Sequence, residues 1–510
     1  MGKQNIYIFL IIILIFNAIG CSMLHKDSNV LIVDDYNGID LENINHYEIH
    51  VNFNPKDKSY LAKQTTLYIN NTKKVLDKVY FHIYPNVFKS VETAPVLFSS
   101  STISKEDYSP GGMKISRIMV DNREVDFKTQ GIGGVILKIE LPNSLKPNSK
   151  AIIDFEYHIR LPSNIDRFGY GEDVFNFGNW YPIACVYDED GWNLEPYYSI
   201  GDPFYSDIAN YDVIITVPRD MVIASSGSII SEKTGFKRKT YTIKGKLIRD
   251  FAWVASTDFS IEEIDVGKTT IKLYTLEDKP EIIKFALETG EDSMNIFNRI
   301  FGEYPYSTYS IAMTEFPTGM EYPGIVFIGR GYFNSHLKNR LEQIIVHETA
   351  HQWWYGVVGN NQINEAWLDE SLTSYSEVIY MIEKYGKAQG MDYYDYFYQE
   401  NYEHGKAFLP DNIIVKKPLN EFKSWNDYGL LVYVRGAMFL NEIKEDFGID
   451  KLYRILSKYY TKYRFYNANT EGFIEICQDV TNVSFEDRVN RWLYAVEQLT
   501  AKGLDTIIPL

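Results

Sequence analysis

The chain has 510 residues, a length that predicts two or three domains rather than a single core. Hydrophobic residues make up 45% and charged residues 23%, which excludes a wholly disordered chain and a membrane protein with many spans. Acidic residues number 68 and basic residues 51, and the net charge of −17 argues against nucleic acid as a partner, because duplex binding needs clustered cations.

The first twenty residues resemble a bacterial lipoprotein signal peptide. Lys3 precedes an apolar run, and Gly20 stands immediately before Cys21. In such a signal the peptide is cut before the cysteine, and the thiol carries the lipid. We therefore expect removal of residues 1–20, lipidation of Cys21 and attachment of the protein to the cell membrane. An uncleaved anchor helix is the alternative, although the apolar run is short for a full span. Both interpretations place the protein outside the cytoplasm.

Residues 21–45 are polar and lack periodicity, as in a flexible tether. Strand patterns then dominate from residue 46 to about residue 264, which predicts an antiparallel β-sandwich as the N-terminal domain. Within this domain the stretch Phe168–Phe204 is predicted to be more loop than strand. The predicted strands are short and rich in β-branched and aromatic residues: Tyr47–Phe53, Thr66–Ile69, Val79–Ile83, Ala151–His158, Tyr211–Val217 and Thr240–Ile243.

The pattern changes near residue 265, where we place the start of a second domain that extends to residue 510. Apolar residues recur at helical spacing from Lys279 to Phe301, and helical patterns dominate after Leu337. Two strands are predicted between them, at Tyr309–Met313 and Gly324–Ile328. The sequence therefore predicts an α+β protein, with a β-rich domain at residues 46–264 and a mainly α-helical domain at residues 265–510.

The second domain contains the motif HExxH, in a helix-compatible run without Pro or Gly. His347 and His351 are one helical turn apart, so both imidazoles face the same side. Imidazole nitrogens suit zinc, and a hydrolytic zinc needs a third protein ligand and one open position for water. Glu370, on the next predicted helix, is the candidate for that ligand. We expect one zinc ion per chain, bound by His347, His351 and Glu370.

Glu348 follows His347 by one residue and so lies at the edge of the ligand face. There a carboxylate can reach water on the metal without binding the metal itself, and we expect Glu348 to act as the general base. The alternative for the whole motif is a surface helix with two solvated histidines. That alternative does not explain the apolar residues on both sides of the motif, Ile344 to Val346 and Trp353 to Trp354.

Three blocks of the sequence resemble the M1 family of zinc aminopeptidases, the gluzincins related to aminopeptidase N. The first is HExxH followed by eighteen residues and Glu370, within a block similar to the family's WLNEGF. The second is Thr318–Tyr322, which stands where the family has GAMEN, and the third is Tyr433–Ala437, similar to YxKGA. The resemblance covers about residue 45 to about residue 500. It implies a saddle-shaped β domain followed by a thermolysin-like zinc metallopeptidase domain.

The resemblance also implies roles for single residues. Glu321 would bind the free α-amino group of a peptide substrate, which makes such an enzyme an exopeptidase. Gly319 and Met320 would contact the substrate beside Glu321. Tyr433 would donate a hydrogen bond to the oxyanion of the tetrahedral intermediate. Family members supply a second amine contact from the β domain, and we expect it within Phe168–Phe204.

The block at 318–322 also departs from the family pattern. Thr318, Gly319 and Tyr322 replace the family's Gly, Ala and Asn. The backbone contacts of this loop and the pocket for the first side chain are therefore expected to differ from those of the family.

The predicted function is the zinc-dependent hydrolysis of N-terminal residues from peptides. An endopeptidase that uses the same zinc chemistry is one alternative. A catalytically dead, peptide-binding surface lipoprotein is another, and its hallmark would be the loss of a metal ligand or of the base. His347, Glu348, His351 and Glu370 are all present.

Overall fold

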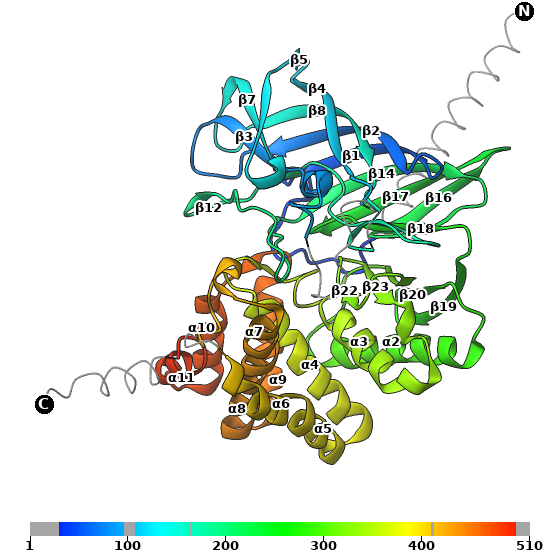
Figure 1. The fold of residues 1–510 in the computed structure, drawn as a ribbon. Coiled ribbons are helices and arrows are strands. Elements are labelled where there is room, and N and C mark those ends of the chain that lie inside the picture. The colour runs from blue at the N-terminus through cyan, green and yellow to red at the C-terminus, as the bar shows by residue number, and fades with distance from the viewer. Residues whose placement is uncertain (1–29, 96–107, 164, 410–412, 496–510) are drawn as a thin grey trace, which may run out of the picture.

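The computed structural model describes residues 30–95, 108–163, 165–409 and 413–495. The predicted signal peptide and Cys21 lie outside these residues. A β-rich N-terminal half and a helical C-terminal half lie on opposite sides of the molecule (Figure 1). The predicted fold class is confirmed. Among the described residues, no helix combines the length and the apolar character needed to cross a bilayer.

The largest element of the N-terminal half is an eight-stranded sheet. Its neighbouring strands are antiparallel, except that β1 and β14 run parallel. Buried side chains alternate with exposed or partly exposed ones along β1, β2, β8 and β14, so one face packs on the core and the other is turned toward water. The strands in spatial order are β16 (Ser228–Thr234), β17 (Arg238–Ile248), β14 (Ala209–Pro218), β1 (His46–Asn54), β2 (Ser59–Ile69), β8 (Lys150–Arg160), β4 (Gly112–Val120) and β5 (Arg123–Glu124).

Smaller sheets complete the β-rich half. The stretch Phe168–Phe204, predicted as mostly loop, contributes only strands of two or three residues. Five of its aromatic residues are buried, and the ring of Phe177 stacks on that of Trp253 with 3.6 Å between centroids. The five are Phe168, Phe177, Trp180, Tyr181 and Phe204. One sheet contains β15 (Val222–Ser225), β18 (Trp253–Ser256), β10 (Phe175–Phe177) and β9 (Phe168–Tyr170), a second contains β11 (Ile183–Ala184), β3 (Leu76–His82), β7 (Ile136–Leu145) and β6 (Phe127–Gln130), and β12 (Tyr187–Asp188) pairs with β13 (Gly191–Trp192).

A five-stranded mixed sheet follows along the chain, and α2 (Pro280–Ile300) and α3 (Lys338–Ala350) pack against it. Its central strands are parallel, whereas both edge strands pair antiparallel with their neighbours. The boundary that we predict between residues 264 and 265 falls within its first strand, and the position of that boundary stays a prediction. The spatial order is β19 (Ser260–Val266), β20 (Thr269–Thr275), β21 (Thr308–Thr314), β23 (Ile325–Gly329) and β22 (Gly319–Met320).

The helix α4 (Trp367–Tyr385) lies at the centre of the helical half. Its residues from Trp367 to Tyr380 are all buried, and it contacts α2, α3, α5, α8 and a π-helical segment, Gly429–Arg435. This packing fixes the start of α4 next to the end of α3. The other helices are α5 (Lys387–Tyr394), α6 (Asn401–Gly405), α7 (Trp425–Tyr428), α8 (Gly436–Phe447), α9 (Ile449–Tyr463), α10 (Thr470–Thr481) and α11 (Glu486–Trp492), and β24 (Gly359–Asn360) pairs with β25 (Asn467–Ala468).

Candidate functional site

The helix α3 carries both predicted histidine ligands at its C-terminal end. Leu341, Ile345 and Val346 are fully buried and anchor the helix. His347 lies in the last turn, and His351 follows the last helical residue while it keeps helical backbone angles. The two rings therefore remain one turn apart, as the sequence predicts, and lie 4.8 Å from each other between centroids.

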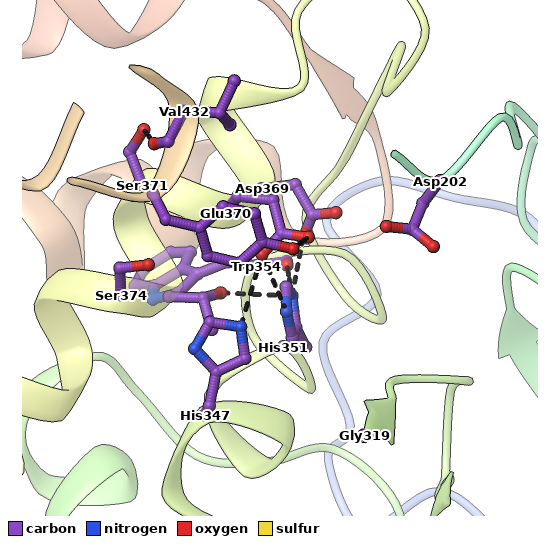
Figure 2. Close-up of polar contacts among 12 residues, drawn as sticks. Asp202, Gly319, His347, His351, Trp354, Asp369, Glu370, Ser371, Ser374 and Val432 are labelled. Carbon is purple, nitrogen blue, oxygen red and sulfur yellow. Dashed lines mark hydrogen bonds and ion pairs between the residues drawn. The ribbon is translucent and has the colours of Figure 1, made fainter. Parts of the chain in front are cut away.

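The three predicted metal ligands converge on one point. Nε2 of His347 lies 3.3 Å from Oε2 of Glu370, and Nε2 of His351 lies 3.4 Å from the same oxygen. Figure 2 shows both rings beside the carboxylate of Glu370. Ligand atoms at about 2.0–2.1 Å from a tetrahedral zinc are about 3.4 Å from one another. Zinc is the cofactor that fits this set of donors.

The outward nitrogen of each histidine is bonded to a carboxylate from α4. Nδ1 of His347 donates to Oε1 of Glu377 at 2.7 Å, and Nδ1 of His351 donates to Oδ1 of Asp369 at 2.7 Å. Gln362 in turn donates to Asp369. Because these bonds hold the proton on Nδ1, they leave Nε2 of each ring as the metal-binding atom. Sequence reasoning did not identify either carboxylate.

The predicted metal ligands line a cavity of about 380 Å³. The cavity contains every predicted metal-binding, catalytic and substrate-binding residue except Met320, whose sulfur lies 3.0 Å from Nε of Arg167. The lining consists of Arg167, Asp202, Phe316, Thr318, Gly319, Glu321, Ile344, His347, Glu348, His351, Glu370, Trp425, Asn426, Gly429 and Tyr433.

Glu348 meets the requirements of a base beside the metal ligands. Its side chain is buried, Oε2 has no hydrogen-bond partner among the described residues, and burial raises the pKa of the carboxyl to about 7. The edge strand β22 runs directly against it. A Cβ atom at Gly319 would lie 2.0 Å from Oε1 of Glu348, so a larger residue at position 319 would displace the Glu348 side chain.

Glu321 presents a second buried carboxylate to the cavity. The residue is only 4% exposed, and Oε1 has no hydrogen-bond partner among the described residues. The pKa of Glu321 is raised well above its ordinary value, mainly by burial and to a smaller extent by the charge of Asp202. A buried carboxylate with a free oxygen is stabilised by a cationic hydrogen-bond donor such as an ammonium group.

Asp202 adds a carboxylate from the β-rich half. In Figure 2 it faces the metal ligands across the cavity. One oxygen each from Asp202, Glu321 and Glu370 lie within 4.8 Å of one another. Asp202 falls within Phe168–Phe204, where we expect the second amine contact. The sequence did not single it out, because a Gly-Asp-Pro sequence indicates a turn as readily as a binding site.

Arg167 pairs with Asp202 inside the cavity wall. Nη2 of Arg167 lies 2.5 Å from Oδ1 of Asp202, and the two residues are 5% and 6% exposed. The ion pair orients the Asp202 carboxylate and compensates part of its charge. No sequence motif around Arg167 predicted this contact, since the two residues come from separate loops.

Tyr433 lies in the π-helical segment that borders the cavity. Its hydroxyl donates to Oε1 of Glu370 at 2.5 Å, and its ring stacks on that of His347 with 5.7 Å between centroids. Burial and the charge of Glu370 raise the pKa of Tyr433 well above its ordinary value, so the hydroxyl keeps its proton. A protonated phenol at this position can donate a hydrogen bond to a group bound at the metal ligands.

Comparisons with known proteins find similarity to one family of peptidases. The profile of the peptidase family M1 domain matches residues 285–492. The chain is 23% identical to Aminopeptidase M1-D of Oryza sativa subsp. japonica over 58% of the chain and 36% of that protein. It is 22% identical to human Endoplasmic reticulum aminopeptidase 2 over 65% of the chain and 36% of that protein. The chain thus spans about a third of the length of these curated relatives.

Solved structures share the fold over nearly the whole described chain. An M1 zinc metallopeptidase from Deinococcus radiodurans aligns with a TM-score of 0.61, at 16% identity, over 88% of this chain and 94% of that one. A mutant of the same enzyme bound to the substrate Tyr-Ser-Ala aligns with a TM-score of 0.59, at 15% identity and with the same coverage.

Proposed function

Because residues 285–492 match the peptidase family M1 domain, we propose that the protein is a zinc-dependent metallo-aminopeptidase that removes residues from the free N-termini of peptides. One observation carries the proposal: Glu321 lies beside the predicted metal ligands, and its buried Oε1 has no hydrogen-bond partner in the part of the chain that the structure describes. The relatives named aminopeptidases and the substrate-bound neighbour support the same activity.

The proposed reaction uses the residues that line the cavity. A zinc ion held by His347, His351 and Glu370 would lower the pKa of a water molecule and polarise the scissile carbonyl. Glu348 would accept the proton of the attacking water and then donate it to the departing amine. Tyr433 would donate a hydrogen bond to the carbonyl oxygen, a contact that strengthens as negative charge develops.

The two carboxylates beside the ligands would select the free N-terminus. Glu321 and Asp202 would accept hydrogen bonds from the α-ammonium group of the first residue. A blocked N-terminus brings no positive charge and would leave Oε1 of Glu321 buried without a partner among the described residues, which is costly. This selection separates an aminopeptidase from an endopeptidase that uses the same zinc chemistry.

One assay tests the proposal against its alternatives. The purified protein is incubated with a free-amine peptide and with the N-acetylated form of the same peptide, with and without a chelator. We expect cleavage of the free-amine peptide alone, and its loss on chelation. Equal cleavage of both peptides would indicate an endopeptidase, and no cleavage in the presence of zinc would indicate a binding protein. Glu321→Ala should weaken cleavage of the free-amine peptide and so reduce the enzyme's preference for it over the blocked peptide.

We also propose that the protein is an extracytoplasmic lipoprotein, anchored to the cell membrane through Cys21. The proposal rests on the sequence of residues 1–21, which lie outside the described residues. Mass spectrometry of the native membrane form should find a lipid-modified Cys21 as the first residue, and Cys21→Ser should release the protein from the membrane. An unmodified Met1 start would contradict the proposal.

A further inference from the structure

The residue after Glu321 is tied to the other half of the molecule. Tyr322 is fully buried, and its hydroxyl donates to Oδ1 of Asn179 at 2.7 Å. Asn179 lies in the loop after β10, so this hydrogen bond joins the two halves of the chain. Burial raises the pKa of Tyr322 well above its ordinary value, and the phenol therefore remains a hydrogen-bond donor.

Asn179 is itself held in place by a buried carboxylate. Its Nδ2 donates to Oδ2 of Asp250 at 2.7 Å. The other oxygen of Asp250 accepts from the hydroxyl of Tyr181 at 3.0 Å and from the backbone N–H of Phe251 at 2.6 Å. Because both atoms of the Asn179 amide and both oxygens of Asp250 are engaged, the orientation of the amide is defined and its oxygen faces Tyr322.

The backbone of the same loop is fixed by the metal-binding segment. Nε2 of Gln352, the residue after His351, donates to the carbonyl oxygen of Tyr322 at 3.3 Å. Oε1 of Gln352 accepts from the backbone N–H of Gly324 at 2.8 Å. The loop that carries Glu321 is thus held on one side by the metal-binding segment and on the other by the β-rich half.

The loop after β10 is shaped for a large residue at position 322. A Cβ atom at Gly178 would lie 1.9 Å from the hydroxyl oxygen of Tyr322 and 2.5 Å from Cζ. Tyr322 therefore fills the space that a side chain at position 178 would occupy. At this position the sequence departs from the family block GAMEN, in which a shorter asparagine follows the glutamate and could not reach as far.

We propose that Tyr322 is a positioning residue for amine recognition, which holds Glu321 at its distance from the metal ligands through the chain Tyr322–Asn179–Asp250. The inference rests on the proposed function. None of the described residues donates a hydrogen bond to Oε1 of Glu321 that could hold it in place. Its position therefore depends on the backbone of the adjoining residues, and on the β-rich half through Tyr322.

The test uses Tyr322→Phe, which keeps the ring and removes only the hydroxyl. If Glu321 is displaced, its contact with the substrate amine weakens equally in the ground state and in the transition state. Such a change raises KM and leaves kcat unchanged. We expect KM for a leucine anilide with a free amine to rise about five- to tenfold, with kcat within about twofold of the wild-type value. Asn179→Gly should give the same split, since glycine tolerates the positive φ of 49° at that residue.

The two substitutions remove the same hydrogen bond, so their effects should not add. The double variant Tyr322→Phe/Asn179→Gly should have the KM of either single variant. Additive effects would mean that the residues act independently and would overturn the proposed chain.

Tyr306→Phe is the matched control. Tyr306 is also buried, and its hydroxyl donates to the carbonyl oxygen of Leu247 in the β-rich half at 2.6 Å, but it does not line the cavity. Its removal should leave KM unchanged. An equal rise of KM in Tyr306→Phe, or a fall of kcat alone in Tyr322→Phe, would overturn the positioning role.

The test distinguishes a failure of the positioning role from a failure of the proposed function. If the wild type discriminates between the free-amine anilide and its acetylated twin and Tyr322→Phe has an unchanged KM, only the positioning role is lost. If the wild type treats both substrates equally, amine recognition itself is absent, and both proposals are overturned.

Discussion

Oδ1 of Asp369 lies 2.7 Å from Nδ1 of His351, on the side of the ring opposite the metal-binding nitrogen. This contact holds the ring in the tautomer that binds metal and raises the basicity of Nε2. Asp369→Ala should therefore weaken zinc binding by about ten- to a hundredfold. Competition with a chromophoric chelator measures the change. Glu475→Gln, at an exposed ion pair with Lys462, is the control that should leave zinc affinity unchanged.

Glu348→Gln should separate metal binding from catalysis. The glutamine retains the shape of the side chain but cannot accept the proton, so kcat should fall by roughly a hundred- to ten-thousandfold. Because Glu348 is not a predicted ligand, the zinc content should stay at one ion per chain. Elemental analysis and steady-state kinetics on the same preparation check both results, and a loss of zinc would assign Glu348 to the metal site instead.

Tyr433→Phe should lower turnover without a comparable loss of substrate affinity. The hydroxyl is placed to donate to the carbonyl oxygen as charge develops, and removal of one such donor typically lowers kcat about a hundredfold. We expect kcat to fall by about that factor with KM within about threefold. A rise in KM with unchanged kcat would instead assign the hydroxyl to ground-state binding.

Asp202→Asn should destabilise the protein as well as weaken amine binding. The substitution leaves Arg167 as a buried cation without its ionic partner, which costs roughly 3 kcal/mol. Urea unfolding should show this loss. Glu156→Gln, at an exposed ion pair with Lys63, should change the free energy of unfolding by less than about 1 kcal/mol. Similar losses in the two variants would show that the buried pair has no special energetic role.

Asp250 should give stability a distinct dependence on pH. Burial raises its pKa from 3.8 to about 6, so between these values the folded protein holds a proton that the unfolded chain has lost. Stability from this group is therefore present at low pH and declines as the pH rises through 6. Relative to Asp250→Asn, the wild-type free energy of unfolding should fall by up to about 3 kcal/mol between about pH 4 and pH 6. Parallel urea-unfolding profiles for the two proteins would contradict this assignment.

Local periodicity accounts for the part of the site that the sequence could predict. His347 and His351 share one helix face because of their spacing, and Glu370 follows in a segment whose apolar residues indicate the next helix. Strands such as β1, β8 and β14 and the helix α2 were predicted for the same reason, since each depends on neighbours in the sequence.

Contacts between distant segments could not be predicted. Asp202 and Arg167 reach the cavity only because the β-rich half packs on the helical half, and an isolated Gly-Asp-Pro or Asp-Arg sequence carries no such information. The parallel pairing of β1 with β14 is similar, because it joins segments far apart in the chain. Asp369 is adjacent in sequence to the predicted ligand Glu370. Its role, however, depends on the direction in which Nδ1 of His351 points, which the sequence does not reveal.

Because Tyr322 packs closely against Gly178, the loop that carries Glu321 is a poor candidate for transplantation by itself. Moving residues 318–322 into a relative with a side chain at the position of Gly178 would place two groups in the same volume. A functional chimera would have to exchange both segments together. Directed evolution of substrate preference in this protein should accordingly randomise positions 178 and 322 as one unit.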